Sequence, residues 1–373
     1  MLKLIRTVLI LASSVFFNDG FAYAMAVPRK VAVAGATGRT GSFVVKALLE
    51  RGVDGKVYVY SSWHGNCCLI ICLSKVVALV RDVEKANEKL PIDDENLFVL
   101  KCDLGNEDEI TACLDGCDSA VWAASGFTDN RENSWIVQLK KVLGFAFTPS
   151  KTIDAVGVPA MAKFFNGEDS ELAKIVMLSS AGVTRPSWDE SKKERLVGCA
   201  EIPIVRLNPF NILNIKAECE ENLRKSGTKY CIFRPCGLND SHPKGLRPIL
   251  SQGDVAVGRI NRNDAARVLV ECLFVPEAEG KTFESFTLEG LYPGDSILSP
   301  LARMPRDSDQ GISEDVATAN YAMIQQLLPG TKQESASLAM GQTYEQFDKG
   351  ETGRLGERGK EDAEGAFVTS NNN

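Results

Sequence analysis

The stretch Val31-Ala32-Val33-Ala34-Gly35-Ala36-Thr37-Gly38-Arg39-Thr40-Gly41 decides the fold of this chain. Its first four residues are small or β-branched and predict a buried strand. Residues 42–51 predict a helix, because their large apolar side chains recur at helical spacing as Val44, Val45, Leu48 and Leu49. Gly52 is expected to cap this helix at its C-terminus. A strand, a glycine-rich turn and a helix in this order begin the β-α-β unit of a Rossmann-type sheet.

Short apolar runs alternate with amphipathic stretches through most of the chain, which is typical of a parallel sheet covered by helices. Further strands are expected at residues 76–81, 97–102, 119–123, 174–179 and 230–234. From about Gly253 we expect a smaller lobe that contains a helix at 263–274 and a strand at 281–288. The predicted fold class is therefore α/β, a Rossmann-type doubly wound parallel sheet with a small C-terminal lobe.

The glycine turn has the chemistry that binding a dinucleotide requires. Gly35, Gly38 and Gly41 permit a tight turn, close approach of the backbone to a pyrophosphate and close packing of the following helix. The N-terminus of that helix offers N–H donors to the phosphates. Thr37, Arg39 and Thr40 complete the turn and are further candidate binding residues. The alternative is a glycine turn with a purely structural role.

The residue at the end of the second strand discriminates between NAD and NADP, because an acid there binds the ribose 2′-hydroxyl and a base binds a 2′-phosphate. Here that residue is Arg81. A charge-assisted Arg–phosphate contact contributes roughly 1.5–3 kcal/mol, so NADP is favoured over NAD. Arg39 could supply a second such contact. Asp82 follows Arg81 directly and argues in the other direction, and a solvated Arg81 without a ligand is the alternative.

Several segments together resemble one known family. They are Gly35 to Gly41, Val80-Arg81, Cys102 to Leu104, Ala123 to Gly126, Leu178 to Pro186, Lys216 to Glu220, Ser226-Gly227 and Phe233 to Leu238. They resemble the atypical short-chain dehydrogenase/reductases of the NmrA-like type over roughly residues 31–289. The Thr-Arg-Pro and Arg-Pro-Cys segments are most similar to plastid NAD(P)-binding proteins of plants and algae.

The resemblance implies an NAD(P)-binding domain over residues 30–290 and a place for each candidate residue along the cofactor. Asp103 and Leu104 would flank the adenine, Ala123 and Ala124 would line the ribose and pyrophosphate, and Ser179, Lys216 and Pro235 would surround the nicotinamide. Ser179 and Lys216 are also the candidate catalytic residues. A solvated Lys216 on a helix surface beside Glu218 and Glu220 is the alternative.

The chain departs from the family at the position of the proton donor. Members of the wider family carry a Tyr four residues before the Lys, and here that position is Ile212. Losing a general acid removes roughly 10²–10⁴ of rate. The sequence therefore favours a redox-responsive scaffold or assembly factor that binds NADP and has little activity. The alternative is an NADPH-dependent oxidoreductase with another proton donor, acting on a small carbonyl, quinone or isoprenoid-like substrate.

Composition argues against two other kinds of partner. The net charge of −7, with a pI near 5.2, disfavours nucleic acid, and no basic cluster interleaved with aromatic residues is present. The eleven cysteines are odd in number and scattered through apolar stretches, which indicates reduced core cysteines. His64, Cys67, Cys68 and Cys72 match no standard zinc spacing, so no metal is expected.

The N-terminus predicts a signal peptide over residues 1–24. Lys3 and Arg6 precede an apolar run to Phe17, and Ala22-Tyr23-Ala24 forms a cleavage site. The run is too short to span a bilayer, and a buried first strand or helix is the alternative. Reduced cysteines behind a signal peptide are reconciled by a bipartite plastid presequence reaching to about residue 30. The expected location is thus a plastid, with the ER lumen or secretion as alternatives.

Three other segments lie outside the regular alternation. Residues 57–75 separate the first helix from the second strand, where a few residues are usual. Deleting them would join Lys56 to Val76, and the codons of Val and Lys permit a retained in-frame intron; a real hairpin insertion is the alternative. Residues 291–329 are expected to form a helical extension, and residues 330–373 to form a disordered tail.

Overall fold

A computed structural model of the protein describes residues 30–53, 75–125, 152–167, 170–208, 211–288, 297–308 and 312–327. The expected presequence, almost all of the atypical segment 57–75 with its His and Cys residues, and the expected tail from residue 330 lie outside the described residues. The predictions for these parts of the chain stay predictions.

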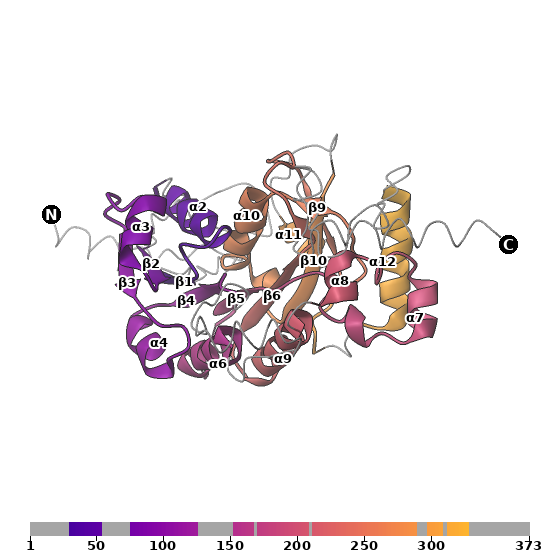
Figure 1. Cartoon of the computed structure of the whole chain (residues 1–373), viewed down its shortest axis with the longest axis horizontal. Helices are drawn as coiled ribbons and strands as arrows, with labels where there is room; N and C mark the ends of the chain where they lie inside the picture. The colour runs from indigo at the N-terminus through magenta and orange to yellow at the C-terminus, as the bar shows by residue number, and fades with distance from the viewer. Residues whose placement is uncertain are drawn as a thin grey trace, which may run out of the picture.

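Seven parallel strands form the body of one sheet, in the order β3-β2-β1-β4-β5-β6-β10 (Figure 1). They are β1 (Lys30–Ala34), β2 (Lys75–Val80), β3 (Leu97–Lys101), β4 (Ser119–Trp122), β5 (Ile175–Leu178), β6 (Tyr230–Pro235) and β10 (Lys281–Thr287). The chain starts in the middle of the sheet, builds outward to β3, returns and continues on the other side of β1. This doubly wound order confirms the predicted Rossmann-type fold.

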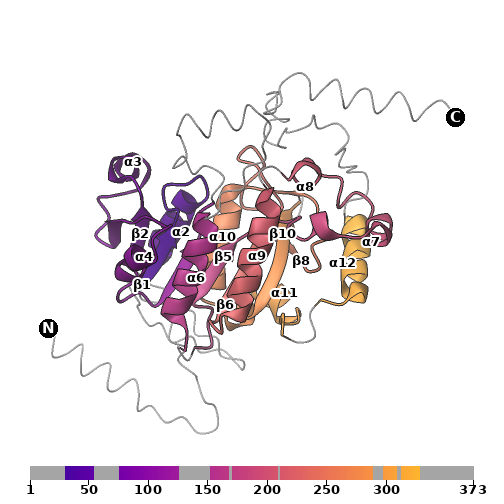
Figure 2. The same cartoon turned by 60° about the horizontal axis from the view of Figure 1, so that its bottom comes forward.

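Helices cover both faces of the sheet. They are α2 (Gly41–Val53), α3 (Val83–Lys89), α4 (Glu107–Cys113), α6 (Ile153–Phe165), α9 (Ile212–Lys225) and α10 (Arg262–Cys272). Helices α2 and α10 pack together on one face, and α6 and α9 lie side by side on the other (Figure 2). Gly52 lies inside α2, which continues to Val53, so its expected role as the C-terminal cap is wrong.

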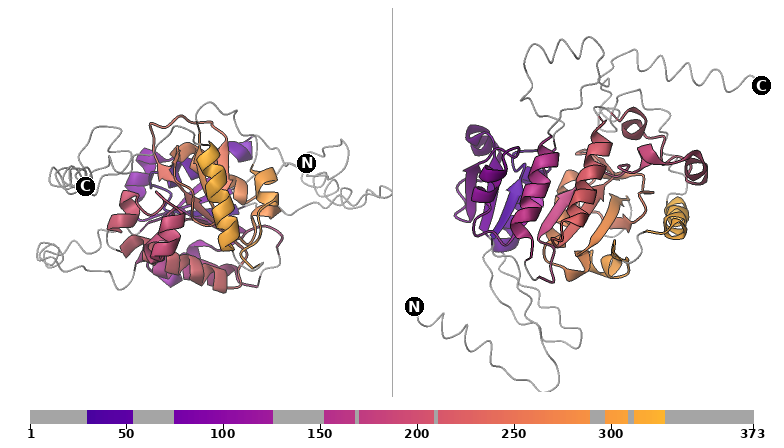
Figure 3. Two further views of the ribbon diagram at one scale, coloured as in Figure 1. Left: turned by 90° about the vertical axis from the view of Figure 1, so that its right-hand side faces the viewer. Right: turned by 90° about the horizontal axis from the view of Figure 1, so that it is seen from below.

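The C-terminal part departs from the expected division into domain and lobe. The helix and strand assigned to the lobe are α10 and β10, but β10 pairs with β6 in the main sheet and α10 packs on α2. The smaller lobe comprises the helices α7 (Glu190–Arg195), α8 (Pro203–Leu207) and α12 (Glu314–Leu327) and three short strands that extend the same sheet beyond β10, namely β7 (Gly237–Leu238), β8 (Pro248–Ser251) and β9 (Arg259–Ile260). Helix α12, yellow in Figure 3, lies at the end of the sheet opposite β3. The short helix α11 (Leu298–Ala302) packs near α10 in the main core.

The described residues contain no helix that is both long and apolar enough to cross a bilayer. Seven of the eight described cysteines are buried and all eight are free thiols, which agrees with the expectation of reduced core cysteines.

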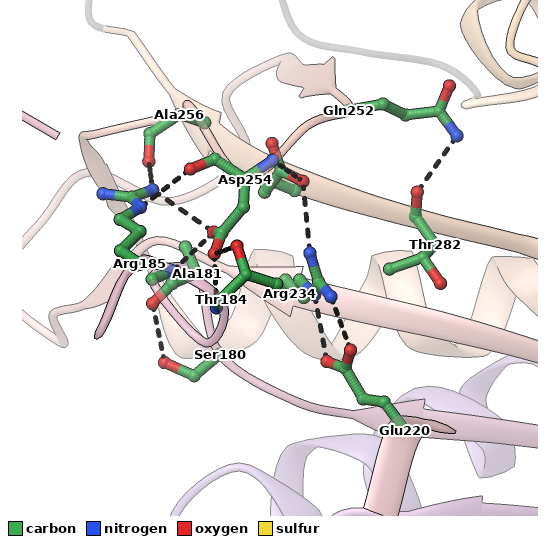
Figure 4. Close-up of polar contacts among 12 residues, drawn as sticks. Ser180, Ala181, Thr184, Arg185, Glu220, Arg234, Gln252, Asp254, Ala256 and Thr282 are labelled. Carbon is green, nitrogen blue, oxygen red and sulfur yellow. Dashed lines mark hydrogen bonds and ion pairs between the residues drawn. The ribbon is translucent and has the colours of Figure 1, made fainter. Parts of the chain in front are cut away.

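A buried ionic network joins α9, β6, β10 and the lobe (Figure 4). Arg234 on β6 donates to both carboxylate oxygens of Glu220 on α9, at 2.9 and 2.5 Å, and lies 3.9 Å from Glu284 on β10. Glu284 accepts a hydrogen bond from the backbone N–H of Asp254 at 3.0 Å. Fully buried charges persist when each has a partner, so these side chains hold the elements that carry them in register.

Asp254 and Arg185 continue this network into the lobe. Asp254 accepts from the backbone N–H groups of Gly182 and Thr184 at 2.6 and 2.8 Å, and from the Thr184 hydroxyl at 2.7 Å. The Arg185 guanidinium is fully buried and donates to the backbone carbonyls of Asp254 and Ala256 (Figure 4). It also donates to the backbone carbonyl of Cys199. These hydrogen bonds link the loop after β5 to residues 254–256, which precede β9.

Glu284 gives this network a pH dependence that can be measured. Burial and the neighbouring Asp254 carboxylate raise the pKa of Glu284 to about 7, although Arg234 opposes the shift. The folded chain therefore keeps a proton that the unfolded chain loses near pH 4.5, and stability should fall as pH rises from about 4.5 to 7, by at most about 3 kcal/mol. In Glu284→Gln, the free energy of unfolding measured by urea denaturation should depend less on pH between about 4.5 and 7 than in the parent protein. An unchanged slope in the variant would contradict the prediction.

Candidate dinucleotide site

The glycine turn is folded tightly between β1 and α2 and against the end of β4. Gly35 has a φ of +76°, and a Cβ there would lie 2.7 Å from the Cα of Ala124. A Cβ on Gly41 would overlap the Gly35 carbonyl. The Gly38 N–H donates to that same carbonyl at 2.8 Å. Only a residue without a side chain fits at positions 35 and 41, so the backbone is free to approach a ligand closely.

The N-terminus of α2 adds favourable electrostatics to the turn. The helix begins at Gly41, has 13 residues and carries no acidic side chain in its first turn. The positive end of its dipole is therefore left for an external anion rather than being compensated by the protein's own carboxylates. This arrangement suits the pyrophosphate of a dinucleotide.

Arg81 directly follows β2 and is exposed, and its neighbour Asp82 is the N-cap of α3. The Asp82 carboxylate accepts from the backbone N–H of Lys85 at 3.1 Å. Capping thus engages one oxygen of this carboxylate in a hydrogen bond to α3. Asp82, the acid that argued against NADP in the sequence, therefore has a structural role as a helix cap.

Arg39 projects from the glycine turn toward the segment after β7, where its Nη2 lies 2.8 Å from Oδ2 of Asp240. Arg262, the first residue of α10, binds the other oxygen of Asp240 at 2.7 Å. Partial burial opposes ionisation, but hydrogen bonds from Arg262 and Arg39 lower the pKa of Asp240. The sequence did not predict a role for Asp240. Its carboxylate pairs with Arg39, a cation that was expected to contact a phosphate of the ligand.

The residues expected near the adenine and the pyrophosphate lie after β3 and β4, the strands that flank β2 and β1. Asp103 accepts from the Gly105 N–H at 2.9 Å through its carboxylate, and Leu104 is buried in the core beneath α6. Ala123 and Ala124 directly follow β4, and their backbone contacts Gly35. The glycine turn and these two alanines form one continuous surface of backbone.

The residues expected at the nicotinamide end lie after β5, at the end of β6 and on α9, and all are buried. The ends of the two strands are joined by hydrogen bonds from Ser179 N to Phe233 O at 2.8 Å and from Ala181 N to Pro235 O at 3.0 Å. The Ser179 hydroxyl is buried and lies close enough to the Glu220 carboxylate to help lower the pKa of that group.

Lys216 is only 7% exposed, so the alternative of a solvated surface lysine is wrong. Its Nζ lies 3.9 Å from Oδ1 of Asp154, a fully buried carboxylate near the start of α6. Asp154 also accepts from the indole N–H of Trp122 at 3.0 Å. Sequence reasoning missed Asp154 and Trp122. The one signal in the sequence is an acidic residue, Asp154, within an apolar stretch. The neighbouring residues do not indicate which side chain this acid contacts.

Ile212 is the first residue of α9 and is 7% exposed. It packs with Ile202, Val205 and Leu213 in a small apolar cluster. The position that would carry the proton donor is therefore occupied by a core side chain.

Comparison with known proteins identifies the class. The sequence profile described as NAD(P)H-binding matches residues 73–276, more than half of the chain. The chain belongs to this NAD(P)H-binding family.

Individual relatives and structures are similar to the chain over most of its length. An uncharacterized chloroplastic protein of Arabidopsis thaliana is 29% identical over 274 residues, 73% of this chain and 81% of that protein. The oxidoreductase YlbE of Lactococcus lactis is 18% identical with a TM-score of 0.49, covering 74% of this chain and 97% of its own. A short-chain dehydrogenase/reductase of Veillonella parvula in complex with NADP is 14% identical with a TM-score of 0.45, covering 71% and 97%. The two bacterial likenesses concern the fold alone.

The pairing of Arg39 with Asp240 leads to a prediction about affinity. Asp240→Asn removes the carboxylate that neutralises Arg39, so calorimetry at low salt should show about two- to fivefold tighter binding of NADPH. In an Arg39→Ala background the same substitution should have no effect. Weaker binding by Asp240→Asn would show instead that Asp240 orients Arg39 toward the ligand.

Proposed function

We propose that this protein binds NADP(H) in preference to NAD(H), as an atypical short-chain dehydrogenase/reductase of the NmrA-like type. The observation that carries the preference is Arg81, a cation at the end of β2 whose acidic neighbour Asp82 caps α3. The glycine turn and the N-terminus of α2 supply the phosphate end of the site. Asp103, Leu104, Ala123, Ala124, Ser179, Lys216 and Pro235 are proposed to line the rest of the cofactor.

We further propose that binding, rather than turnover, is the main task of this site. Ile212 packs in an apolar cluster where a Tyr donor would stand, and a hydride acceptor would develop alkoxide charge without a positioned acid. A redox-responsive scaffold or assembly factor fits a cofactor site of this kind. A plastid location is supported by the relative described as chloroplastic, and a fluorescent fusion of the first thirty residues tests it.

A second candidate function, an NADPH-dependent oxidoreductase acting on a small carbonyl, quinone or isoprenoid-like substrate, is favoured by one observation. The buried side chains of Lys216 and Ser179 both lie where the nicotinamide end of the cofactor is proposed, and both carry hydrogen-bond donors. This candidate requires a proton donor other than residue 212.

The cofactor preference is tested by titration of NADPH and NADH. The parent protein should bind NADPH more tightly, and Arg81→Ala should narrow the difference by about tenfold, since one charge-assisted contact to the 2′-phosphate is lost. Lys85→Ala is the matched control, because Lys85 is an exposed cation on the adjoining α3. Equal affinities for the two dinucleotides in the parent would contradict the proposal.

The question of turnover is tested by NADPH oxidation with panels of carbonyls and quinones, followed at 340 nm (roughly the nicotinamide absorbance maximum). We expect the parent protein to oxidise NADPH no faster than Lys216→Ala, because no acid is positioned at residue 212. Saturable oxidation that Lys216→Ala abolishes would establish the oxidoreductase in place of the scaffold.

A further inference from the structure

Trp122, Asp154 and Lys216 form a buried polar cluster that joins β4, α6 and α9. Trp122 ends β4 and is fully buried, and its indole N–H donates to Asp154 at 3.0 Å. Gly157 lies one turn after Asp154, and a Cβ there would overlap the indole ring. The absent side chain leaves room for the indole beside α6, and the buried indole N–H holds the Asp154 carboxylate on one side.

The charge of Asp154 has one cationic partner among the described residues. A fully buried carboxylate is costly unless a cation and hydrogen bonds compensate it, and Lys216 lies 3.9 Å from Oδ1. The other carboxylate on the same stripe of α9, Glu220, is already bound by Arg234 and Arg224. Lys216 is therefore drawn toward α6 and β4 rather than along its own helix.

The location of this cluster connects it with the dinucleotide site. Trp122 is followed directly by Ala123 and Ala124, whose backbone contacts the glycine turn. An ammonium group has three donors, and one interaction at 3.9 Å leaves donors for a further acceptor. The acceptors expected at this edge of the sheet are the hydroxyls of a ribose.

We propose that Asp154 is a positioning residue, which holds the Lys216 ammonium against the hydroxyls of the nicotinamide ribose. This proposal rests on the proposed binding of NADP(H). Trp122 and Gly157 support it by fixing the carboxylate, and Asp154 itself does not touch the cofactor. The pair acts on the nicotinamide half of the ligand and not on its adenosine half.

The test compares two ligands, NADPH and adenosine 2′,5′-bisphosphate, which lacks the nicotinamide riboside. Asp154→Asn keeps the side-chain volume and an acceptor for Trp122 but removes the charge. It should weaken the binding of NADPH by about tenfold and change the affinity for adenosine 2′,5′-bisphosphate by less than about twofold. In a Lys216→Met background, Asp154→Asn should have no further effect on either ligand. Glu279→Gln is the matched control, because it removes a carboxylate that pairs with Arg306 just before the start of β10, at the edge of the sheet opposite the proposed site.

The outcomes separate this inference from the function on which it rests. If the parent protein binds neither ligand, the proposed NADP(H) binding fails. If the parent binds both and Asp154→Asn weakens both equally, Asp154 has a general structural role and the inference fails. Unchanged affinity for NADPH in Asp154→Asn, with an unchanged melting temperature, would overturn it as well.

Discussion

The bidentate ion pair between Arg234 and Glu220 is the interaction on which the arrangement of the site depends. It is buried and joins β6 to α9, and therefore sets both the rotation and the height of α9 against the sheet. Lys216 lies one turn before Glu220 and Ile212 one turn before Lys216, so the same pair decides what these two residues face. Removing one partner of such a pair leaves an uncompensated buried charge at a cost of about 3–5 kcal/mol. A chain with a displaced α9 would lose the placement of Lys216 before it lost the glycine turn.

The backbone conformation at the start of α9 explains why Ile212 is a core residue. Asn211 adopts a left-handed conformation with a φ of 57°, and the side chain of Asn208 accepts from the Leu213 N–H at 2.9 Å. The first turn of α9 is thus capped by a residue several positions upstream, on the loop that follows α8. This geometry presents Ile212 to Ile202 and Val205 of the lobe. The proposed phosphate end of the site is thus built on β1 and α2, whereas a Tyr donor at the position usual in the wider family would have to replace a core residue between α9 and the lobe.

Local pattern predicted the strands and helices of the sheet because each of them repeats its apolar residues with its own period. The division between domain and lobe failed at α10 and β10, because the pairing of β10 with β6 is a long-range choice that no local period contains. Gly52 failed as a cap because the helix continued past it. The same distinction between local patterns and long-range contacts applies to the candidate site. The glycine turn is local and was predicted, but Asp240 reaches Arg39 across 201 residues, and Asp154 meets Lys216 only through the packing of α6 on α9.

β1 and β2, the strands on either side of the segment that interrupts the first β-α-β unit, pair in a regular parallel register. β1 pairs with β2 from Lys30 opposite Lys75 to Ala34 opposite Leu79, so the parallel register is regular on both sides of the interruption. The match to the NAD(P)H-binding profile begins at residue 73, within the last three residues of that segment. Joining Lys56 to Val76 would put Lys56 in the place of Lys75, and a lysine would again face Lys30 at the start of β2. The register therefore accommodates a chain with the segment and a chain without it, because a lysine faces Lys30 in both cases and the pairing of β2 with β3 begins only at Val76.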